Sequence, residues 1–161
     1  MPFPDYVEFI ASLNDHGVKY LIVGAHALAY HARPRATKDL DIFIDRTQAN
    51  AERVLTAMNA FFKAKTGYGV KDLMDAGTII QLGVAPVRID LMTQIAGVSN
   101  FADAWKKRVE GGFGSARAYF ISLDNLITSK EAADRLQDRA DVRVLKKARE
   151  KRKTSLNQKK R

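Results

Sequence analysis

The segment from residue 20 to residue 44 constrains the fold more than any other part of the chain. It begins with an apolar run that ends at Gly24, continues with an alanine-rich stretch over 25–32, and closes with the run DLDIFI over 39–44. Apolar, β-branched runs are typical of buried strands, and alanine favours helix. The order predicts a strand, a glycine turn, a helix and, after Pro34 breaks that helix, a second strand.

Asp39 and Asp41 in the second of these strands carry the strongest functional signal. Successive side chains of a strand point to opposite faces, so the two carboxylates project from one side while Leu40 points into the core. Two such carboxylates repel each other unless a divalent cation lies between them, and Mg²⁺ held by carboxylates and substrate phosphates is the common solution. Taken alone, Asp-x-Asp on a strand is more often solvent-facing charge than a metal site, so the motif needs support from elsewhere.

Asp90 and Gly24 provide that support. Asp90 lies in the apolar run 87–91 and adds a third carboxylate if its strand neighbours the strand of the other two. Three converging carboxylates suit a two-metal site, in which one cation binds a triphosphate and the second activates an attacking hydroxyl. At Gly24 a strand ends and a helix begins, so backbone N–H groups and the positive end of the helix can face a phosphate. Three cations are near in sequence: Arg33, Arg35 and Lys38.

The rest of the chain predicts helices and strands that complete one compact domain. Helical spacing covers 5–16, Thr47 caps a helix to about Phe62, and the runs 78–82 and 87–91 form a hairpin. The remaining expected elements are a loop with at most one helical turn over 63–76, a short helix capped by Asn100, a flexible loop over 111–114, a strand over 116–121, a helix from Ser122 or Asp124 to Arg135, and a helix from about Gln137 to Arg149.

Length and composition limit the classes of protein that the chain can belong to. A chain of 161 residues that is 46% apolar can build one core without disulfides, and the absence of cysteine excludes thiolate metal sites and cysteine nucleophiles. The longest nearly apolar stretch, 20–30, is about half the length needed to cross a bilayer, and the first residues lack the basic start of a secretory signal. We expect a soluble, cytoplasmic protein without membrane contact.

The net charge of +9 is concentrated at the end of the chain. Residues 145–161 hold nine Lys or Arg against one acidic residue, Glu150, while the remainder is nearly neutral. A run of this density can neutralise several phosphates and predicts salt-dependent binding of RNA or DNA. A disordered, solubilising end is an equal alternative, because the run has no aromatic residue to stack on bases. We therefore separate a domain over 1–145 from a basic tail over 146–161.

The ordered combination of these features resembles a known family. Residues 24–41, with the strand before them, resemble the signature of the DNA polymerase beta-like nucleotidyltransferase superfamily. The fit is closer to small bacterial nucleotidyltransferases akin to the toxins of abortive-infection toxin–antitoxin pairs, and it rests on residues 20–27, His31, 34–35, 37–42, 87–92 and 121–145. The resemblance implies an α+β fold with a mixed, mostly antiparallel nucleotidyltransferase sheet flanked by helices, and with further helices at the C-terminal end.

The resemblance also implies a reaction: Mg²⁺-dependent transfer of NMP from an NTP to a hydroxyl of RNA or protein. Asp39 and Asp41 would bind metal, and Asp90 would be the third carboxylate, which activates the acceptor. The residues expected to contact the nucleotide are Gly24, Ala25, Arg35, Lys38 and Lys130. Without the resemblance, Lys130 would be interpreted as an exposed helical lysine. The implied setting is a toxin–antitoxin pair or phage defence, with a cognate toxin or antitoxin as partner.

Three positions depart from the family pattern. Ala25 stands where relatives have Gly or Ser, and it offers no hydroxyl and tolerates positive φ poorly, so we expect it to reduce nucleotide affinity or activity. Ala32 and Asp134 stand where relatives tend to have Gly. A second hypothesis therefore stays open: a module that keeps the fold without efficient catalysis and acts as an antitoxin-like or RNA-binding protein.

Three ring side chains follow Gly24 on the same predicted helix. His26 and His31 are five positions apart and do not share a helix face, so they predict packing and not a zinc pair. Tyr30 can line the nucleotide site, but an aromatic residue on an apolar helix is more often a packing residue.

Overall fold

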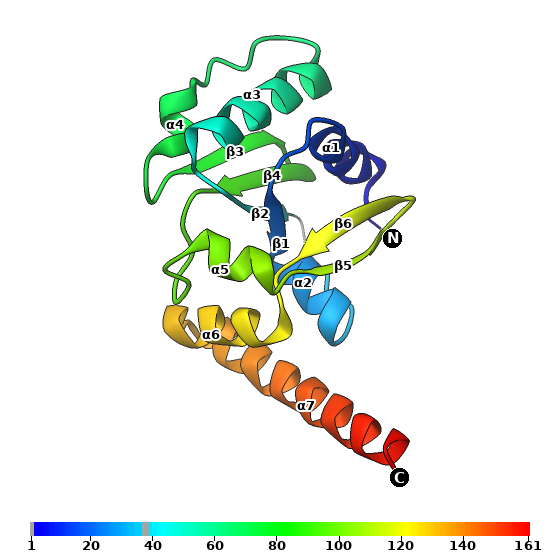
Figure 1. The fold of residues 1–161 in the computed structure, drawn as a ribbon. Helices are drawn as coiled ribbons and strands as arrows, with labels where there is room; N and C mark the ends of the chain where they lie inside the picture. The colour runs from blue at the N-terminus through cyan, green and yellow to red at the C-terminus, as the bar shows by residue number, and fades with distance from the viewer. Residues whose placement is uncertain (1, 37–38) are drawn as a thin grey trace.

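The structure is a computed structural model that describes residues 2–36 and 39–161. A six-stranded mixed sheet with strand order β3-β4-β2-β1-β6-β5 runs through the molecule and is flanked by helices (Figure 1). The helices are α1 (Pro4–Asp15), α2 (Gly24–His31), α3 (Gln48–Phe62), α4 (Val70–Met74), α5 (Phe101–Lys106), α6 (Leu123–Ala133) and α7 (Leu136–Lys159). The strands are β1 (Tyr20–Val23), β2 (Asp39–Ile44), β3 (Ile79–Val84), β4 (Val87–Met92), β5 (Val109–Phe113) and β6 (Ala116–Phe120).

The strand pairings place β2, which carries Asp39 and Asp41, beside β4, which carries Asp90. β2 lies between β1, to which it is antiparallel, and β4, to which it is parallel. β3–β4 and β5–β6 are antiparallel hairpins, while β6 joins β1 in parallel. The mixed, mostly antiparallel sheet is therefore confirmed, and so is the position of the strand that carries Asp90 beside the strand that carries Asp39 and Asp41.

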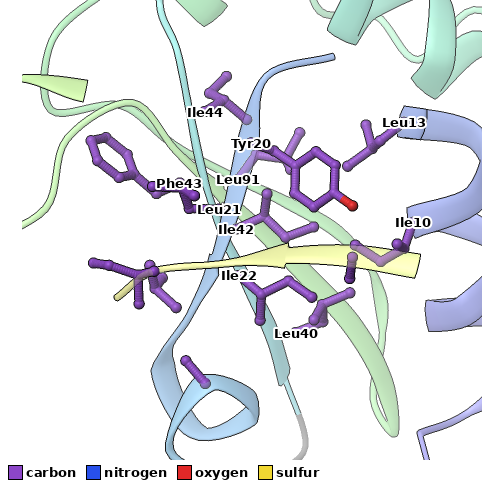
Figure 2. Packing of buried hydrophobic residues seen from close by; sticks show 14 of the residues in the cluster. Ile10, Leu13, Tyr20, Leu21, Ile22, Leu40, Ile42, Phe43, Ile44 and Leu91 are labelled. Atoms are coloured by element: carbon purple, nitrogen blue, oxygen red, sulfur yellow. The ribbon is translucent and has the colours of Figure 1, made fainter. Parts of the chain in front are cut away.

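The core lies where β1 and β2 meet the helices. Ile22 of β1 and Ile42 of β2 are fully buried, together with Ile10 and Leu13 of α1 (Figure 2). The hydroxyl of the buried Tyr20 donates a hydrogen bond to Asn14 Oδ1 at 2.9 Å, so this polar atom has a partner inside the apolar cluster. Burial of these central strands fixes the β2 backbone, from which Asp39 and Asp41 project.

Predicted helix starts agree closely with the structure. The side chain of Thr47 caps α3 by accepting from the N–H of Asn50, and Asn100 Oδ1 caps α5 in the same way at 2.8 Å from the Ala102 nitrogen. Ser122, one of the two predicted starts, caps α6. Short polar side chains at these positions satisfy helix N–H groups that would otherwise lack a partner, which is why the sequence signal is strong.

The flexible loop predicted over 111–114 is wrong, because residues 109–113 form β5. Gly111 and Gly112 gave no side-chain pattern from which a strand could be recognised. A Cβ at Gly111 would overlap the ring of Tyr30, so the glycine allows the strand to pass close to α2. The turn to β6 follows at Gly114, whose φ is +59°. This edge strand is thus specified by close packing and not by an apolar alternation.

The predicted end of the last helix near Arg149 is also wrong, because α7 continues to Lys159. Its C-terminal half extends beyond the rest of the molecule (Figure 1). Lys, Arg, Glu, Gln and Leu favour helix, and neither Gly nor Pro interrupts residues 136–159. The basic run is therefore a continuation of a packed helix, and the boundary drawn at 145/146 falls within that helix. None of the helices in the described part of the chain is long and apolar enough to cross a membrane.

Candidate active site

Three carboxylates share one face at the centre of the sheet. In the β2–β4 register Asp41 is opposite Asp90, and Asp39 is opposite Arg88. Side chains at paired positions of neighbouring strands project to the same side. Asp39, Asp41, Asp90 and Arg88 therefore form one polar group, which we call the carboxylate face.

The carboxylate face has less positive charge than its carboxylates require. Burial, together with the negative charges of Asp90 and Asp39, raises the pKa of Asp41 to about 6. Burial also raises the pKa of Asp90, although the charge of Arg88 opposes this. Asp90 Oδ1 is buried and accepts no hydrogen bond from any residue in the described ranges. Closely spaced, partly desolvated carboxylates of this kind are stabilised by an added cation.

Arg88 provides part of the missing positive charge. Its Nη2 donates to Asp39 Oδ2 at 2.9 Å, and its Nε lies 3.5 Å from Asp90 Oδ1. Within residues 2–36 and 39–161, no three histidine, aspartate or glutamate side chains are gathered closely enough to hold a metal ion as they stand. The oxygen ligands and the charge deficit fit a divalent cation such as Mg²⁺, which would compete with Arg88 for the same carboxylates.

The glycine turn lies directly against this face. Gly24 has a φ of +65°, and a Cβ placed on it would overlap Asp41 Oδ2. Both the backbone conformation and the carboxylate therefore require glycine at this position. Among the described residues no side chain caps the N-terminus of α2, which begins at Gly24 after Val23. The structure confirms the predicted strand, glycine turn and helix, and it places the helix N-terminus beside a carboxylate.

Ala25 affects the turn less than the sequence suggested. The positive φ belongs to Gly24, whereas Ala25 lies inside α2 and is 7% exposed. An alanine in a helix carries no conformational penalty. The remaining consequence of Ala25 is the missing hydroxyl, and not a strained backbone.

A cavity of about 290 Å³ connects the glycine turn with α6 and α7. Gly24 and Asp41 border it on one side, and Lys130 of α6 borders it on another. Further polar side chains of the lining are Gln94, Ser129, Arg135 and Asp138, and Ile79, Met92, Ile95 and Leu126 contribute apolar surface. A concave site with a few convergent polar groups on an apolar background is typical of a small-molecule site.

Lys130 is buried, so the interpretation as an exposed helical lysine is wrong. Its Nζ donates to Asp141 Oδ2 at 2.8 Å and lies 3.6 Å from Asp138 Oδ1. Arg35 Nη1 donates to the other oxygen of Asp141 at 2.5 Å. Burial would raise the pKa of Asp141, but hydrogen bonds from Lys130, Arg35 and Gln137 outweigh it and hold this pKa below its usual value. Lys130 and Arg35, both predicted to contact the nucleotide, are therefore linked through the carboxylate of Asp141 on α7.

The remaining predicted positions can be placed in relation to this geometry. Lys38 lies outside the described residues. Sequence reasoning gave no site role to Arg88 or Asp141, although both had a usable signal. Arg88 is two positions before Asp90 on β4, so the two side chains lie on the same face of the sheet. Asp141 is three positions after Asp138, on the helix face that also carries the buried Leu145. Carboxylates on an apolar helix face are rarely buried without a partner.

The packing predicted for the two histidines of α2 is confirmed, whereas Tyr30 packs on one side only and is 38% exposed. His31 is 4% exposed, and its Nε2 is 2.7 Å from the carbonyl oxygen of Ile121. His26 lies edge-on to Tyr6 and Phe113, with ring centroids 5.6 Å and 5.5 Å away. The Tyr30 ring stacks on Phe120.

Comparison with known proteins gives one family. The profile of a family described as "nucleotidyl transferase of unknown function" matches residues 3–161. A search of curated proteins gives no match. The matched range includes the carboxylate face, the glycine turn and the whole of α7.

Proposed function

The chain belongs to this family of nucleotidyl transferases, and from that premise we propose that it is a Mg²⁺-dependent enzyme that moves NMP from an NTP to a hydroxyl of RNA or protein. The observation that carries the proposal is the contact between Gly24 and Asp41. It puts a carboxylate that would bind metal beside helix N–H groups that would bind phosphate.

The proposed reaction is an in-line displacement at the α-phosphorus of the NTP. The acceptor oxygen forms a bond to phosphorus, the bond to the bridging oxygen breaks, and pyrophosphate leaves. Asp90 accepts the proton of the acceptor hydroxyl, which agrees with the raised pKa of its carboxyl group. Asp39, Asp41 and Asp90 would hold Mg²⁺, which when bound neutralises phosphate charge and makes the hydroxyl more acidic.

The triphosphate would occupy the cavity between α2 and α6. The N–H groups at the start of α2 would donate to phosphate oxygens, and the Lys130 ammonium would supply positive charge. Lys130 is paired with Asp138 and Asp141 in the structure, so phosphate would compete with these carboxylates for it. The long-range connection from Asp141 to Arg35 would keep α7 in place during this exchange.

Nucleotide binding gives the first test of the proposal. We expect calorimetry to detect NTP binding that depends on Mg²⁺ and that Asp41→Asn abolishes. Asp15→Asn, at the exposed end of α1, is the matched control and should bind NTP as the unmodified protein does. Binding that is independent of Mg²⁺ or that persists in Asp41→Asn would contradict a site on the carboxylate face.

A second candidate function is a non-catalytic module that acts as an antitoxin-like or RNA-binding protein. The hydrogen bond from Arg88 to Asp39 favours it, because an internal cation already occupies part of the carboxylate face. The missing hydroxyl at Ala25 points the same way. For such a module Asp39→Ala should leave partner binding intact, whereas an enzyme in a toxin–antitoxin pair should lose activity with the same change.

A further inference from the structure

A second cavity, of about 460 Å³, lies against a different face of α2. The face that borders it carries His26, Ala29 and Tyr30, spaced for one side of a helix. The other walls come from the residues before and in α1, the segment 34–36 and the β5–β6 hairpin, and they include Phe3, Tyr6, Arg35 and Phe120. We call this space the aromatic cavity.

Two of its aromatic side chains are exposed to solvent. Phe3 is 42% exposed and Tyr30 is 38% exposed, whereas most large apolar side chains of the described residues are buried. Tyr30 is held in place because its ring stacks on Phe120 with centroids 4.1 Å apart. Exposed rings on the walls of a cavity are suited to hold a planar ligand.

Tyr6 connects the aromatic cavity to the carboxylate face. Its ring lines the cavity, and its hydroxyl donates to the backbone oxygen of Arg88 at 3.1 Å. Burial raises the pKa of Tyr6, and the negative charges of Asp39, Asp41 and Asp90 raise it further, which reflects how near they are. A ligand in the aromatic cavity would therefore lie across Tyr6 from the carboxylate face, while the triphosphate cavity borders Asp41 from the side of α6.

The charge of the lining selects the ligand further. Arg35, which also pairs with Asp141, is a cation of the wall, and no Asp or Glu occurs among the described residues that line the cavity. Aromatic rings with a nearby guanidinium are the combination that binds unpaired bases of single-stranded nucleic acid. The basic half of α7 adds positive charge to the same chain, with nine Lys or Arg after residue 144.

From these features we propose that the aromatic cavity binds an unpaired nucleobase of an RNA acceptor, and that it thereby presents a nearby ribose hydroxyl to the carboxylate face. This inference rests on the proposed function and selects RNA over protein as the acceptor. The base would stack against the exposed rings of Phe3 and Tyr30, and Tyr6 would separate it from the reacting atoms.

The test is binding of a fluorescein-labelled single-stranded oligoribonucleotide, followed by anisotropy at low salt. We expect Phe3→Ala and Tyr30→Ala each to weaken the affinity by between about 5-fold and 150-fold, the range for loss of one base–aromatic stack. Tyr30→Phe keeps the aromatic ring and should retain most of the affinity for the oligoribonucleotide. Phe62→Ala on α3 is the control, because Phe62 is also 38% exposed and lies outside the cavity lining.

A variant that fills the cavity covers the case in which a ring deletion disturbs folding. Ala29→Leu adds bulk on the face of α2 that borders the cavity, at a position where leucine favours helix, and should weaken RNA binding while the protein stays folded. Circular dichroism of each variant checks the fold.

The outcomes separate this inference from the proposed function. Unchanged affinity in Phe3→Ala, Tyr30→Ala and Ala29→Leu would overturn the inference, and so would an unmodified protein that does not bind the oligoribonucleotide. Mg²⁺-dependent NTP binding by the unmodified protein, measured in parallel, would then still support the proposed function. Loss of that NTP binding in the unmodified protein would instead remove the function on which the inference rests.

Discussion

A Cβ on Gly24 would overlap Asp41 Oδ2, so the N-terminus of α2 and the central carboxylate of β2 are built against each other. The contact joins two residues that are 17 positions apart in the chain through the antiparallel pairing of Val23 with Asp41. The glycine turn and the Asp-Leu-Asp run are therefore one structural unit, and a change in either should affect both.

Gly24→Ala should destabilise the protein and abolish NTP binding, because alanine both disfavours φ of +65° and collides with Asp41. Gly17→Ala is a matched control, since Gly17 has φ of +66° but nothing within 4 Å of its Cβ position. We expect the control to lose about 1 kcal/mol in free energy of unfolding and Gly24→Ala to lose at least about 1 kcal/mol more. Equal losses in denaturant titrations would argue against the contact.

The pKa of Asp41, raised to about 6, predicts a pH dependence of stability in the absence of divalent cations. An acid whose pKa is higher in the folded state binds more protons when folded, so the free energy of unfolding should fall as pH rises from about 4 to 6. Asp41→Asn removes this effect and should be more stable than the unmodified protein at pH 7, by about 1–3 kcal/mol. Denaturant titrations of both proteins at about pH 4.5 and about pH 7 measure this difference in stability. A difference that is the same at both pH values would contradict the raised pKa.

Lys130→Ala should be strongly destabilising, by about 3–5 kcal/mol, because it leaves the buried carboxylates of Asp138 and Asp141 with less positive charge. Lys146→Ala is the control on the same pair of helices. Lys146 and its partner Glu131 are both about half exposed, so this change should cost under about 1 kcal/mol. Thermal or denaturant unfolding of the two variants compares them, and similar losses would mean that the buried network does not hold α7 in place.

Removal of residues 153–161 should leave the fold intact and reduce the salt dependence of RNA binding. Arg152 stays, and its Nη2 donates to the carbonyl oxygen of His31 at the end of α2. The deleted segment carries four cations, Lys153, Lys159, Lys160 and Arg161. For single strands the slope of log affinity against log salt should become shallower by at most about 3. An unchanged affinity and slope would assign the basic end of α7 to solubility.

The sequence was most informative where one residue decides a local structure. Thr47, Asn100 and Ser122 each identified a helix start, because a side-chain oxygen replaces a missing backbone partner. Asp39 and Asp41 could be assigned to one face by strand alternation alone. Their meeting with Asp90 depended on the parallel pairing of β2 with β4, which joins strands far apart in sequence.

What could not be predicted depends on contacts between distant elements. β5 exists because Gly111 passes against the Tyr30 ring, and no local pattern reveals that contact. Lys130 has the sequence environment of an exposed lysine, and only the packing of α6 on α7 buries it between Asp138 and Asp141. The hydrogen bond from Arg88 to Asp39 likewise joins two strands, β4 and β2, that are far apart in the sequence.

Nucleotidyl transfer itself tests the central claim most directly. Each α-³²P-labelled NTP would be incubated with Mg²⁺, the protein and total RNA, and the label that becomes acid-insoluble would be measured. We predict that at least one NTP labels RNA or protein, that EDTA prevents this, and that Asp39→Ala and Asp41→Ala abolish it while Asp15→Asn does not. Labelling that survives both substitutions, or no labelling with any NTP, would contradict an active nucleotidyltransferase site on the carboxylate face.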